Sequence, residues 1–297
     1  MDGGGAEREL TAQETALYDR QIRVWGVDAQ KRLSKAHVLV CGMNGTTIEF
    51  CKNIVLAGVG SLSLMDDQTV TEADLNANFL IPPDESIYGG DPSLIDGEFL
   101  DKFDIVVVSG ASLKTKLLVN DNCRKRSKHI AFYTIDCKDS CGEIFVDLQK
   151  HSFVQKKNGG ETEQQELTYP SLQEAISVPW NNLPRKTTKL YFAMRVLENY
   201  ELSEGHSPGK TTLSDIPAVL AQSLNESQVP TALMERLLAA GKKEHPPVCA
   251  ILGGILGQEV IKSISCKGDP IKNFFYFDAA DGKGVIEDIP TPPPCAN

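Results

Sequence analysis

The segment VLVCGMNGTTIEFCKNIVLAGVG, residues 38–60, reads as a buried strand, a tight glycine turn and an amphipathic helix. This order is typical of the first unit of a Rossmann-like fold. A dinucleotide fingerprint needs three small residues: one for the turn, one that lets phosphate approach the backbone, and one for helix–strand packing. Those positions hold Gly42, Asn44 and Thr47, and Gly45 lies between the last two. Because only the turn glycine is kept, the segment predicts the fold together with a degenerate nucleotide site.

The strand that follows ends at a candidate ribose-binding acid. Residues 61–65 alternate as a strand does, and Asp66 and Asp67 come next. Asp66 lies about 20 residues beyond the glycine turn, the offset at which the acid of a Rossmann fold meets a ribose hydroxyl. An Asp at the end of a strand is equally typical of a turn. The sequence leaves both roles of Asp66 open.

The rest of the chain alternates strands and helices, which indicates an α/β fold. Near the start, Thr11 and Glu14 form a capping box that opens a helix reaching about residue 25. The predicted core face of this helix comprises Ala16, Leu17, Ile22 and Val24 or Trp25. Residues 156–165 are polar and contain two adjacent glycines, which predicts a surface loop.

An apolar helix is predicted near the C-terminus, over residues 248–263. It contains Gly253, Gly254 and Gly257, each of which costs about 1 kcal/mol relative to Ala inside a helix. Close packing of the helix backbone against a neighbour is the simplest reason for them. We expect five segments: a disordered N-terminus (1–10), a Rossmann-like half (11–150), a connecting region of helices and loops (151–245), a helix and strands that complete the domain (246–289), and a tail (290–297).

The interval between residues 78 and 100 is short for this fold. It contains Pro82-Pro83, Gly89-Gly90 and Pro92, and no amphipathic stretch of helical length. A parallel crossover needs about 10 to 12 residues or more. We therefore expect the sheet to lack one helix–strand unit here.

Composition narrows the class of protein. The chain has 30 Lys and Arg against 40 Asp and Glu, a net charge of −10. Nucleic-acid binding is disfavoured, because phosphate binding needs positive charge. No apolar run approaches the about 18 to 20 residues of a membrane helix, and the N-terminus has no signal-peptide core. The eight scattered cysteines fit a reducing compartment, either cytosol or nucleus.

Metal and thiol chemistry find little support in the residue spacing. Cys137 and Cys141 form a single C-x-x-x-C without a second pair at zinc-ribbon spacing, so core or surface thiols are the preferred interpretation. The five histidines form no ligand pattern. We predict no metal site from the sequence.

Long segments resemble the activating enzymes of ubiquitin-like proteins. They are YDRQIRVWG (18–26), AQKRL (29–33), the segment from residue 38 to Asp67, PPVCAILGGILGQEVIK (246–262) and NFFYFDAADGKGVIE (273–287). Together they cover most of an adenylation domain of the ThiF/MoeB type. Within this family they are most similar to the small, regulatory subunits of SUMO-activating enzymes, and to plant versions in particular.

The resemblance implies an activity for the complex rather than for the chain alone. Such enzymes adenylate the modifier's C-terminus with ATP and Mg²⁺, transfer it to a catalytic cysteine, and pass it to a conjugating enzyme. In two-subunit forms one Rossmann half binds ATP and the other is degenerate. The implied partners are a large catalytic subunit, SUMO and, through the complex, the SUMO-conjugating enzyme. The implied location is the nucleus, with the cytoplasm also compatible.

This chain resembles the degenerate half. Asn44 and Thr47 replace glycines, and the family's N-R-Q-F segment has lost its ATP-contacting arginine at Ala77. The loop with the catalytic cysteine and the zinc-binding cysteine pairs are absent from the sequence. No cofactor is thus expected on this chain, and ATP and Mg²⁺ are expected in the partner. Arg20 is retained, and in the family it reaches across the dimer to the partner's ATP phosphate, a task that suits its permanently charged fork.

One departure from the family lies at residues 82–100, which are about 25 residues too short for the helix and strand that relatives have there. The chain is therefore expected to be a shortened isoform. Two alternatives stay open. One is the regulatory subunit for the Nedd-type modifier, and the other is an NAD-dependent oxidoreductase.

Overall fold

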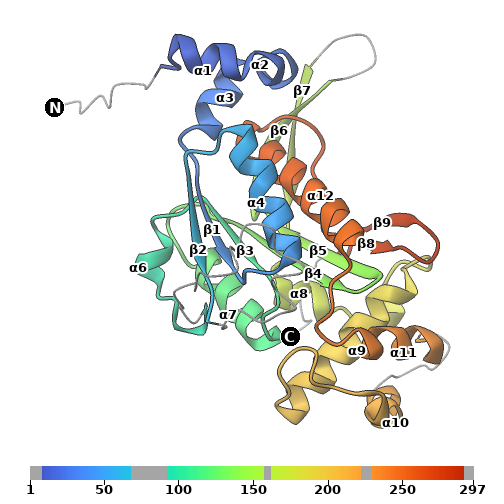
Figure 1. The fold of residues 1–297 in the computed structure, drawn as a ribbon. Helices are drawn as coiled ribbons and strands as arrows, with labels where there is room; N and C mark the ends of the chain where they lie inside the picture. The colour runs from blue at the N-terminus through green and yellow to red at the C-terminus, as the bar shows by residue number, and fades with distance from the viewer. Residues whose placement is uncertain (1–8, 68–91, 157–161, 222–228, 291–297) are drawn as a thin grey trace.

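The computed structural model describes residues 9–67, 92–156, 162–221 and 229–290 of the chain (Figure 1). Of the expected disordered start (1–10), residues 1–8 lie outside these ranges, and of the expected tail (290–297), residues 291–297 do. The segment around Ala77, residues 82–91 and Gly159-Gly160 also lie outside them. The described strands are β1 (His37–Cys41), β2 (Ser61–Met65), β3 (Ile105–Val108), β4 (Ala131–Lys138), β5 (Cys141–Asp147), β6 (Lys150–Lys156), β7 (Thr162–Thr168), β8 (Phe274–Asp278) and β9 (Lys283–Glu287).

The α-helices of the same residues are α1 (Ala12–Leu17), α2 (Asp19–Trp25), α3 (Val27–Leu33), α4 (Gly45–Ala57), α6 (Gly97–Leu100), α7 (Leu113–Arg124), α8 (Leu172–Ile176), α9 (Lys189–Glu204), α10 (Ile216–Ala221), α11 (Thr231–Ala240) and α12 (Pro246–Ser265). Short 3₁₀ helices lie at η1 (Pro92–Leu94), η2 (Trp180–Asn182) and η3 (Leu213–Asp215).

One sheet holds the described strands other than β6 and β7, in the order β2-β1-β3-β4-β5-β8-β9 (Figure 1). The strands β2, β1, β3 and β4 are parallel neighbours, whereas β5, β8 and β9 are added through antiparallel pairs. Parallel strands linked by helices are typical of an α/β sheet with both faces covered. The predicted α/β, Rossmann-like fold with a mostly parallel central sheet is confirmed.

Helices cover both faces because side chains alternate along each strand. Val38 and Val40 of β1 join a core with residues of α4 and α12. Leu39 and Cys41 point to the other face and join a core with α7, α8, α9 and α11. Figure 1 shows α4 and α12 side by side over the first face. The two layers hold β1, and with it the glycine turn, in a fixed position.

Glycines let α12 approach α4 closely. A Cβ at Gly253 would lie 2.7 Å from the Cβ of Glu49 and from the backbone N of Phe50. A Cβ at Gly257 would lie 3.1 Å from the Cβ of Asn53. Nothing lies within 4 Å of the same position at Gly254. The predicted close packing is therefore confirmed at two glycines and wrong at Gly254, which faces away from α4.

By length and composition α12 could cross a membrane, contrary to the expectation that no apolar run approaches that length. Its most apolar 18-residue window has a mean hydropathy of 1.4, and 56% of that window is buried inside the protein. The helix packs against α3, α4 and the sheet. Core helices of soluble proteins are apolar on most sides for the same reason, and we interpret α12 as one.

The N-terminal helix differs from the prediction. The capping box of Thr11 and Glu14 is present, but the helix breaks at Tyr18 into α1 and α2. Neither helix has a buried residue. Leu17 is 74% exposed and Val24 is 80% exposed, so the predicted core face is wrong. Only Ile22 and Trp25 of that face are partly buried.

A two-stranded sheet replaces part of the predicted surface loop at residues 156–165. Strand β6 pairs antiparallel with β7, whose sequence TEQQELT is almost entirely polar. The backbone N of Val154 donates to the carbonyl of Cys266 at 2.9 Å, which ties this hairpin to the end of α12. This sequence lacks the alternation of apolar and polar residues from which a half-buried strand is predicted.

Within the described residues β2 is the edge of the sheet beyond β1. Leu64 of β2 is 50% exposed, and Val55 of the preceding helix α4 is 52% exposed. A helix–strand unit on this side would cover such residues. The open edge agrees with the short interval after β2, although residues 68–91 lie outside the description.

A buried ion network fixes α9 against the sheet. Arg195 of α9 donates from Nη2 to both carboxylate oxygens of Glu143 in β5, at 2.6 Å each. Its Nη1 lies 3.0 Å from Glu198, which also pairs with Lys116 at 2.9 Å. The side chains of Arg195 and Glu143 are each 4% exposed. Burial opposes the charge of Arg195, but Glu143 and Glu198 outweigh it and raise its pKa.

Candidate functional site

The glycine turn after β1 has the backbone geometry that its sequence predicts. Gly42 has a φ of +91°, which side-chain-bearing residues rarely adopt. A Cβ there would lie 2.2 Å from the carbonyl oxygen of Ser109, at the end of β3. Gly42 is therefore needed for the packing of β1 against β3, whether or not a nucleotide binds.

Asn44 caps helix α4. Its side-chain oxygen accepts from the backbone N of Thr47 at 3.0 Å, and its amide nitrogen donates to Ser109 Oγ at 2.7 Å. The hydroxyl of Thr47 donates back to the carbonyl of Gly42 at 2.8 Å. Side-chain caps of this kind contribute about 1 kcal/mol. The residues that replace the phosphate-binding glycines thus stabilise the turn from within.

A carboxylate of the chain itself occupies the N-terminus of α4. Glu244 accepts from the backbone N of Gly45 at 2.6 Å and from that of Thr46 at 3.2 Å. It also accepts from the hydroxyl of Thr46. The first N–H groups of a helix form an anion site, which binds phosphate in nucleotide-binding Rossmann folds. Glu244 comes from the segment before α12, and nothing in the sequence around either residue indicates the contact.

The environment of Glu244 shows how tightly it is held. Burial raises the pKa of its carboxyl, while hydrogen bonds from Thr46 and Gly45 act in the opposite direction. A nucleotide phosphate at this helix N-terminus would have to displace the carboxylate and would lie beside its negative charge. The residues of the loop, as arranged here, do not fit a nucleotide.

Asp66 turns back onto the same loop. Its carboxylate accepts from the backbone N of Met43 at 2.5 Å, and the residue is 9% exposed. Of the two roles that the sequence leaves open, this contact favours the structural one. The structure thus places Asp66 against the loop that carries Gly42, Asn44 and Gly45.

Arg20 lies at the other end of α4. Tyr18, two residues before Arg20, and Gln21, directly after it, reach the C-terminal end of that helix at Gly58 and Leu56. Helix α4 has 13 residues and is about 20 Å long. Arg20 is exposed and forms no hydrogen bond or ion pair with any residue that the structure describes. It therefore cannot serve the degenerate loop of its own chain.

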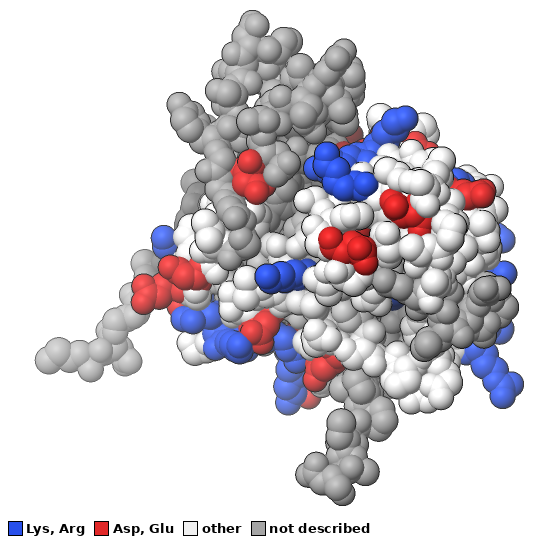
Figure 2. Space-filling model, turned by 90° about the horizontal axis from the view of Figure 1, so that it is seen from below, with Lys and Arg blue, Asp and Glu red and all other residues white. Residues whose placement is uncertain are grey.

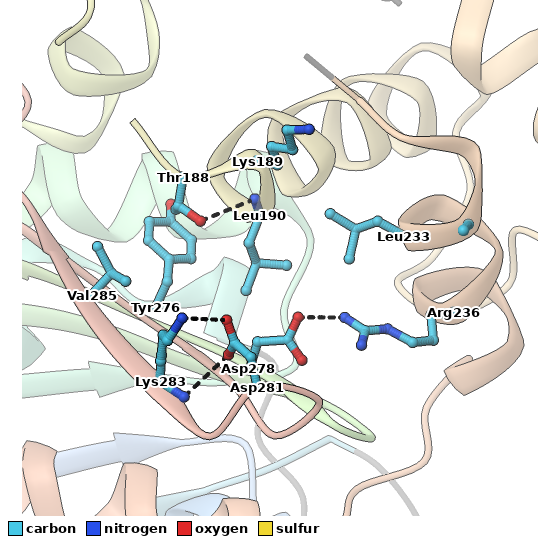
Figure 3. Close-up of a pocket in the computed structure, with 11 residues that line it drawn as sticks. Thr188, Lys189, Leu190, Leu233, Arg236, Tyr276, Asp278, Asp281, Lys283 and Val285 are labelled. Carbon is cyan, nitrogen blue, oxygen red and sulfur yellow. Dashed lines mark hydrogen bonds and ion pairs between the residues drawn. The ribbon is translucent and has the colours of Figure 1, made fainter. Parts of the chain in front are cut away.

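A pocket among the described residues lies elsewhere (Figure 3). It is open, has a volume of about 450 Å³ and is lined by α9, α11, β8 and β9. Arg236 pairs with Asp278 at 2.5 Å, and Lys283 lies 3.8 Å from Asp281. No predicted site residue lines this pocket, and we assign it no ligand.

The charges on the surface are mixed. On the face shown in Figure 2, Lys and Arg side chains alternate with Asp and Glu and form no continuous basic surface among the described residues. A nucleic-acid-binding face would gather positive charge along a groove or a helix.

Comparison with known proteins gives the family of the chain. Residues 18–86 match the model of the ThiF family. The chain is 55% identical to SUMO-activating enzyme subunit 1A of Arabidopsis thaliana over 322 residues, which covers 97% of this chain and 98% of the relative. It is 32% identical to SUMO-activating enzyme subunit 1 of Homo sapiens, with 96% of both chains covered. The Dictyostelium discoideum protein of that name is 30% identical, with 94% of both covered.

These relatives match the chain over nearly its whole length, and the ThiF match contains the glycine turn and Arg20. The chain therefore belongs to the SUMO-activating enzyme subunit 1 family.

Proposed function

We propose that the chain is the small, non-ATP-binding subunit of a heterodimeric SUMO-activating enzyme. It supports adenylation and thioester formation of SUMO on a large catalytic subunit, which binds ATP and Mg²⁺. The observation that carries the proposal is the carboxylate of Glu244 at the N-terminus of α4, where a nucleotide-binding half would hold phosphate. We propose the nucleus as its place of action, with the cytoplasm also compatible.

Exposed apolar side chains support a role as a partner. Leu17 and Val24 of the N-terminal helices and Leu56 of α4 are each more than 65% exposed. The contact of Gln21 with the carbonyl of Leu56 brings α2 to the end of α4 that carries Leu56. Contiguous apolar surface on a folded protein is typical of an interaction site. We propose that the large subunit covers it, with Arg20 directed at the partner's ATP.

Two alternatives are less well supported. An oxidoreductase would need the N-terminus of α4 for the pyrophosphate of NAD, and Glu244 occupies it. An activating enzyme for a Nedd-type modifier would share the fold. The relatives reported above carry the SUMO name. A thioester assay of the heterodimer with SUMO and with the Nedd-type modifier distinguishes the two activities.

We also propose that the chain is a shortened form of its family. The alignment with the Arabidopsis relative extends over 322 residues, more than the 297 of this chain, so part of the relative has no counterpart here. Among the described residues β2 is the last strand on its side of the sheet, and the loss is expected next to it. Co-expression with the large subunit and co-purification test whether the short form still assembles.

The isolated chain is expected to show no ATP-dependent thermal shift. A ligand present at 100 times its Kd stabilises a protein by about 2.7 kcal/mol, which melting curves detect readily. Because Glu244 and Asn44 already use the donors of the loop, millimolar ATP with Mg²⁺ should leave the melting temperature unchanged. The large subunit is the positive control, and a clear shift of the isolated chain would remove the non-ATP-binding role.

Arg20→Ala in the reconstituted heterodimer is expected to slow SUMO-dependent ATP–pyrophosphate exchange by at least about tenfold, because a charge that stabilises phosphate is lost. Co-purification of the two subunits should be unaffected. Arg23→Ala is the matched control, since Arg23 lies one turn away and is paired with Asp19 at 2.8 Å. Unchanged exchange in Arg20→Ala would remove this residue from catalysis, while loss of SUMO thioester with the wild-type pair would contradict the function itself.

A further inference from the structure

Three side chains with metal-ligating atoms meet beside the degenerate loop. Cys137 is the second-last residue of strand β4, Glu244 precedes α12, and Cys249 lies in the first turn of α12. Their two sulfur atoms and a carboxylate oxygen all lie within 4.8 Å of one another. Cys249 is buried, while Cys137 and Glu244 are partly exposed, so an ion can reach the group from solvent.

The backbone fixes the positions of these side chains. Asp139 and Glu244 form a parallel β-bridge, and the backbone N of Asp139 donates to the carbonyl of Lys243 at 2.8 Å. This bridge holds the end of β4 against the segment that carries Glu244. The backbone N of Cys249 donates to the carbonyl of His245 at 3.0 Å, which fixes the first turn of α12 directly after Glu244. The cluster is therefore not a chance meeting of mobile side chains.

The separation of the atoms suits a tetrahedral ion. Zinc bonds of about 2.3 Å to sulfur and about 2.0 Å to oxygen place ligand atoms about 3.5 to 3.8 Å apart. The three ligand atoms lie within 4.8 Å of one another, so shifts of about 1 Å would bring them to the separations that zinc requires. The charge also balances. Zn²⁺ displaces one proton from each thiol into solvent, so two thiolates, one carboxylate and the ion carry the same total charge as two thiols and the carboxylate.

We propose that Cys137, Glu244 and Cys249 form a binding site for a thiophilic divalent cation of the zinc type, with water as the fourth ligand. Soft thiolates combined with a carboxylate favour zinc over magnesium or calcium.

The surroundings of the site support this use. The hydroxyl of Thr46 lies 3.3 Å from Cys249 Sγ and also contacts Glu244, so its one proton can be donated to either ligand and orient it. The carboxylate of Glu244 has room for a metal because it can accept about four contacts. The ion would join the end of β4, the start of α12 and the start of α4. It would thereby hold together the elements around the loop in a chain whose loop does not fit a nucleotide.

The sequence does not reveal this site because its two thiols are far apart in the chain. Spacing directs attention to Cys141 as the neighbour of Cys137, but Cys141 accepts instead from Arg236 at 3.2 Å. Cys249 is embedded in an apolar helix and reads as a core residue.

The test is metal uptake by the purified, reduced full-length chain in a Cys295→Ser background, which removes the thiol of the tail. We expect one Zn²⁺ per chain after dialysis against a weak chelator, two protons released per ion, and a rise in melting temperature. Co²⁺ in place of zinc should give a tetrahedral visible spectrum with a thiolate charge-transfer band. These readouts do not depend on SUMO activation, so their failure would leave the proposed function standing.

Cys137→Ser and Cys249→Ala should each weaken zinc binding by more than the 10- to 100-fold that loss of a ligand's hydrogen-bond partner costs. Cys266→Ser, at the other end of α12, is the matched control and should bind zinc as before. The site would be overturned by equal zinc uptake in Cys137→Ser, or by uptake far below one ion per chain. The site would also be overturned if the purified protein contained a Cys137–Cys249 disulfide and, after reduction of that disulfide, still bound no zinc.

Discussion

Replacing Arg195 by alanine is expected to lower the free energy of unfolding by about 3 to 5 kcal/mol. The Arg195 side chain is 4% exposed. Its guanidinium contacts both carboxylate oxygens of Glu143 and one carboxylate oxygen of Glu198. Its loss would leave the carboxylate of Glu143 buried without its partner, and burial already raises the pKa of that group. The variant also loses the packing of the guanidinium over the rings of Tyr191 and Phe274. Urea unfolding followed by circular dichroism measures the effect.

Two further variants test whether the loss of stability in Arg195→Ala comes from the buried ion network. Arg126→Ala removes a solvent-accessible ion pair with Asp101 and should change stability little. The double variant Arg195→Ala with Glu143→Ala should be less destabilised than the sum of the single variants, because no uncompensated carboxylate remains at Glu143. Equal effects of Arg195→Ala and Arg126→Ala would mean that the buried network does not hold α9 to the sheet.

Gly253→Ala is expected to destabilise the chain by about 2 kcal/mol, whereas Gly254→Ala should stabilise it by up to about 1 kcal/mol. The new Cβ at position 253 would lie 2.7 Å from backbone and Cβ atoms of α4, so the two helices must move apart. At position 254 there is open space, and only the better helix propensity of alanine remains. Thermal unfolding of the two single variants side by side provides the measurement.

The neighbouring variant serves as the control, since both substitutions add the same methyl group to the same helix. If the two variants shift the melting temperature in the same direction and by similar amounts, then close contact between α12 and α4 does not contribute as described. The same experiment in the reconstituted heterodimer reports whether the partner covers Gly254.

Local signals in the sequence were sufficient for most of the fold. The turn at Gly42 depends on a backbone conformation that glycine favours, and it is confirmed. The capping box at Thr11 and Glu14 is confirmed for a similar reason, because its partners are three residues apart. Strands β1 and β3 follow from continuous apolar runs.

Contacts between distant segments could not be predicted in the same way. Glu244 approaches Gly45 from the far end of the chain, and no local pattern records that meeting. The apolar side chains of Leu17 and Val24 predicted a core face, although no described residue of this chain covers them. Periodicity indicates that a face is apolar, but it cannot tell whether the cover belongs to the same chain.

Strands β5 and β8 are neighbours in the sheet although more than a hundred residues separate them in the sequence, which affects the order in which the sheet can form. Phe145 of β5 pairs with Phe274 of β8, and the intervening segments build the hairpin and the helices α8 to α12 first. Closing so long a loop is slow, and during synthesis it cannot happen until the last strands have left the ribosome. The parallel strands β1 to β4 can form early, while the outer edge of β5 stays open to wrong pairing. Until β8 has been made, β5 therefore lacks the strand that covers its outer edge in the folded sheet.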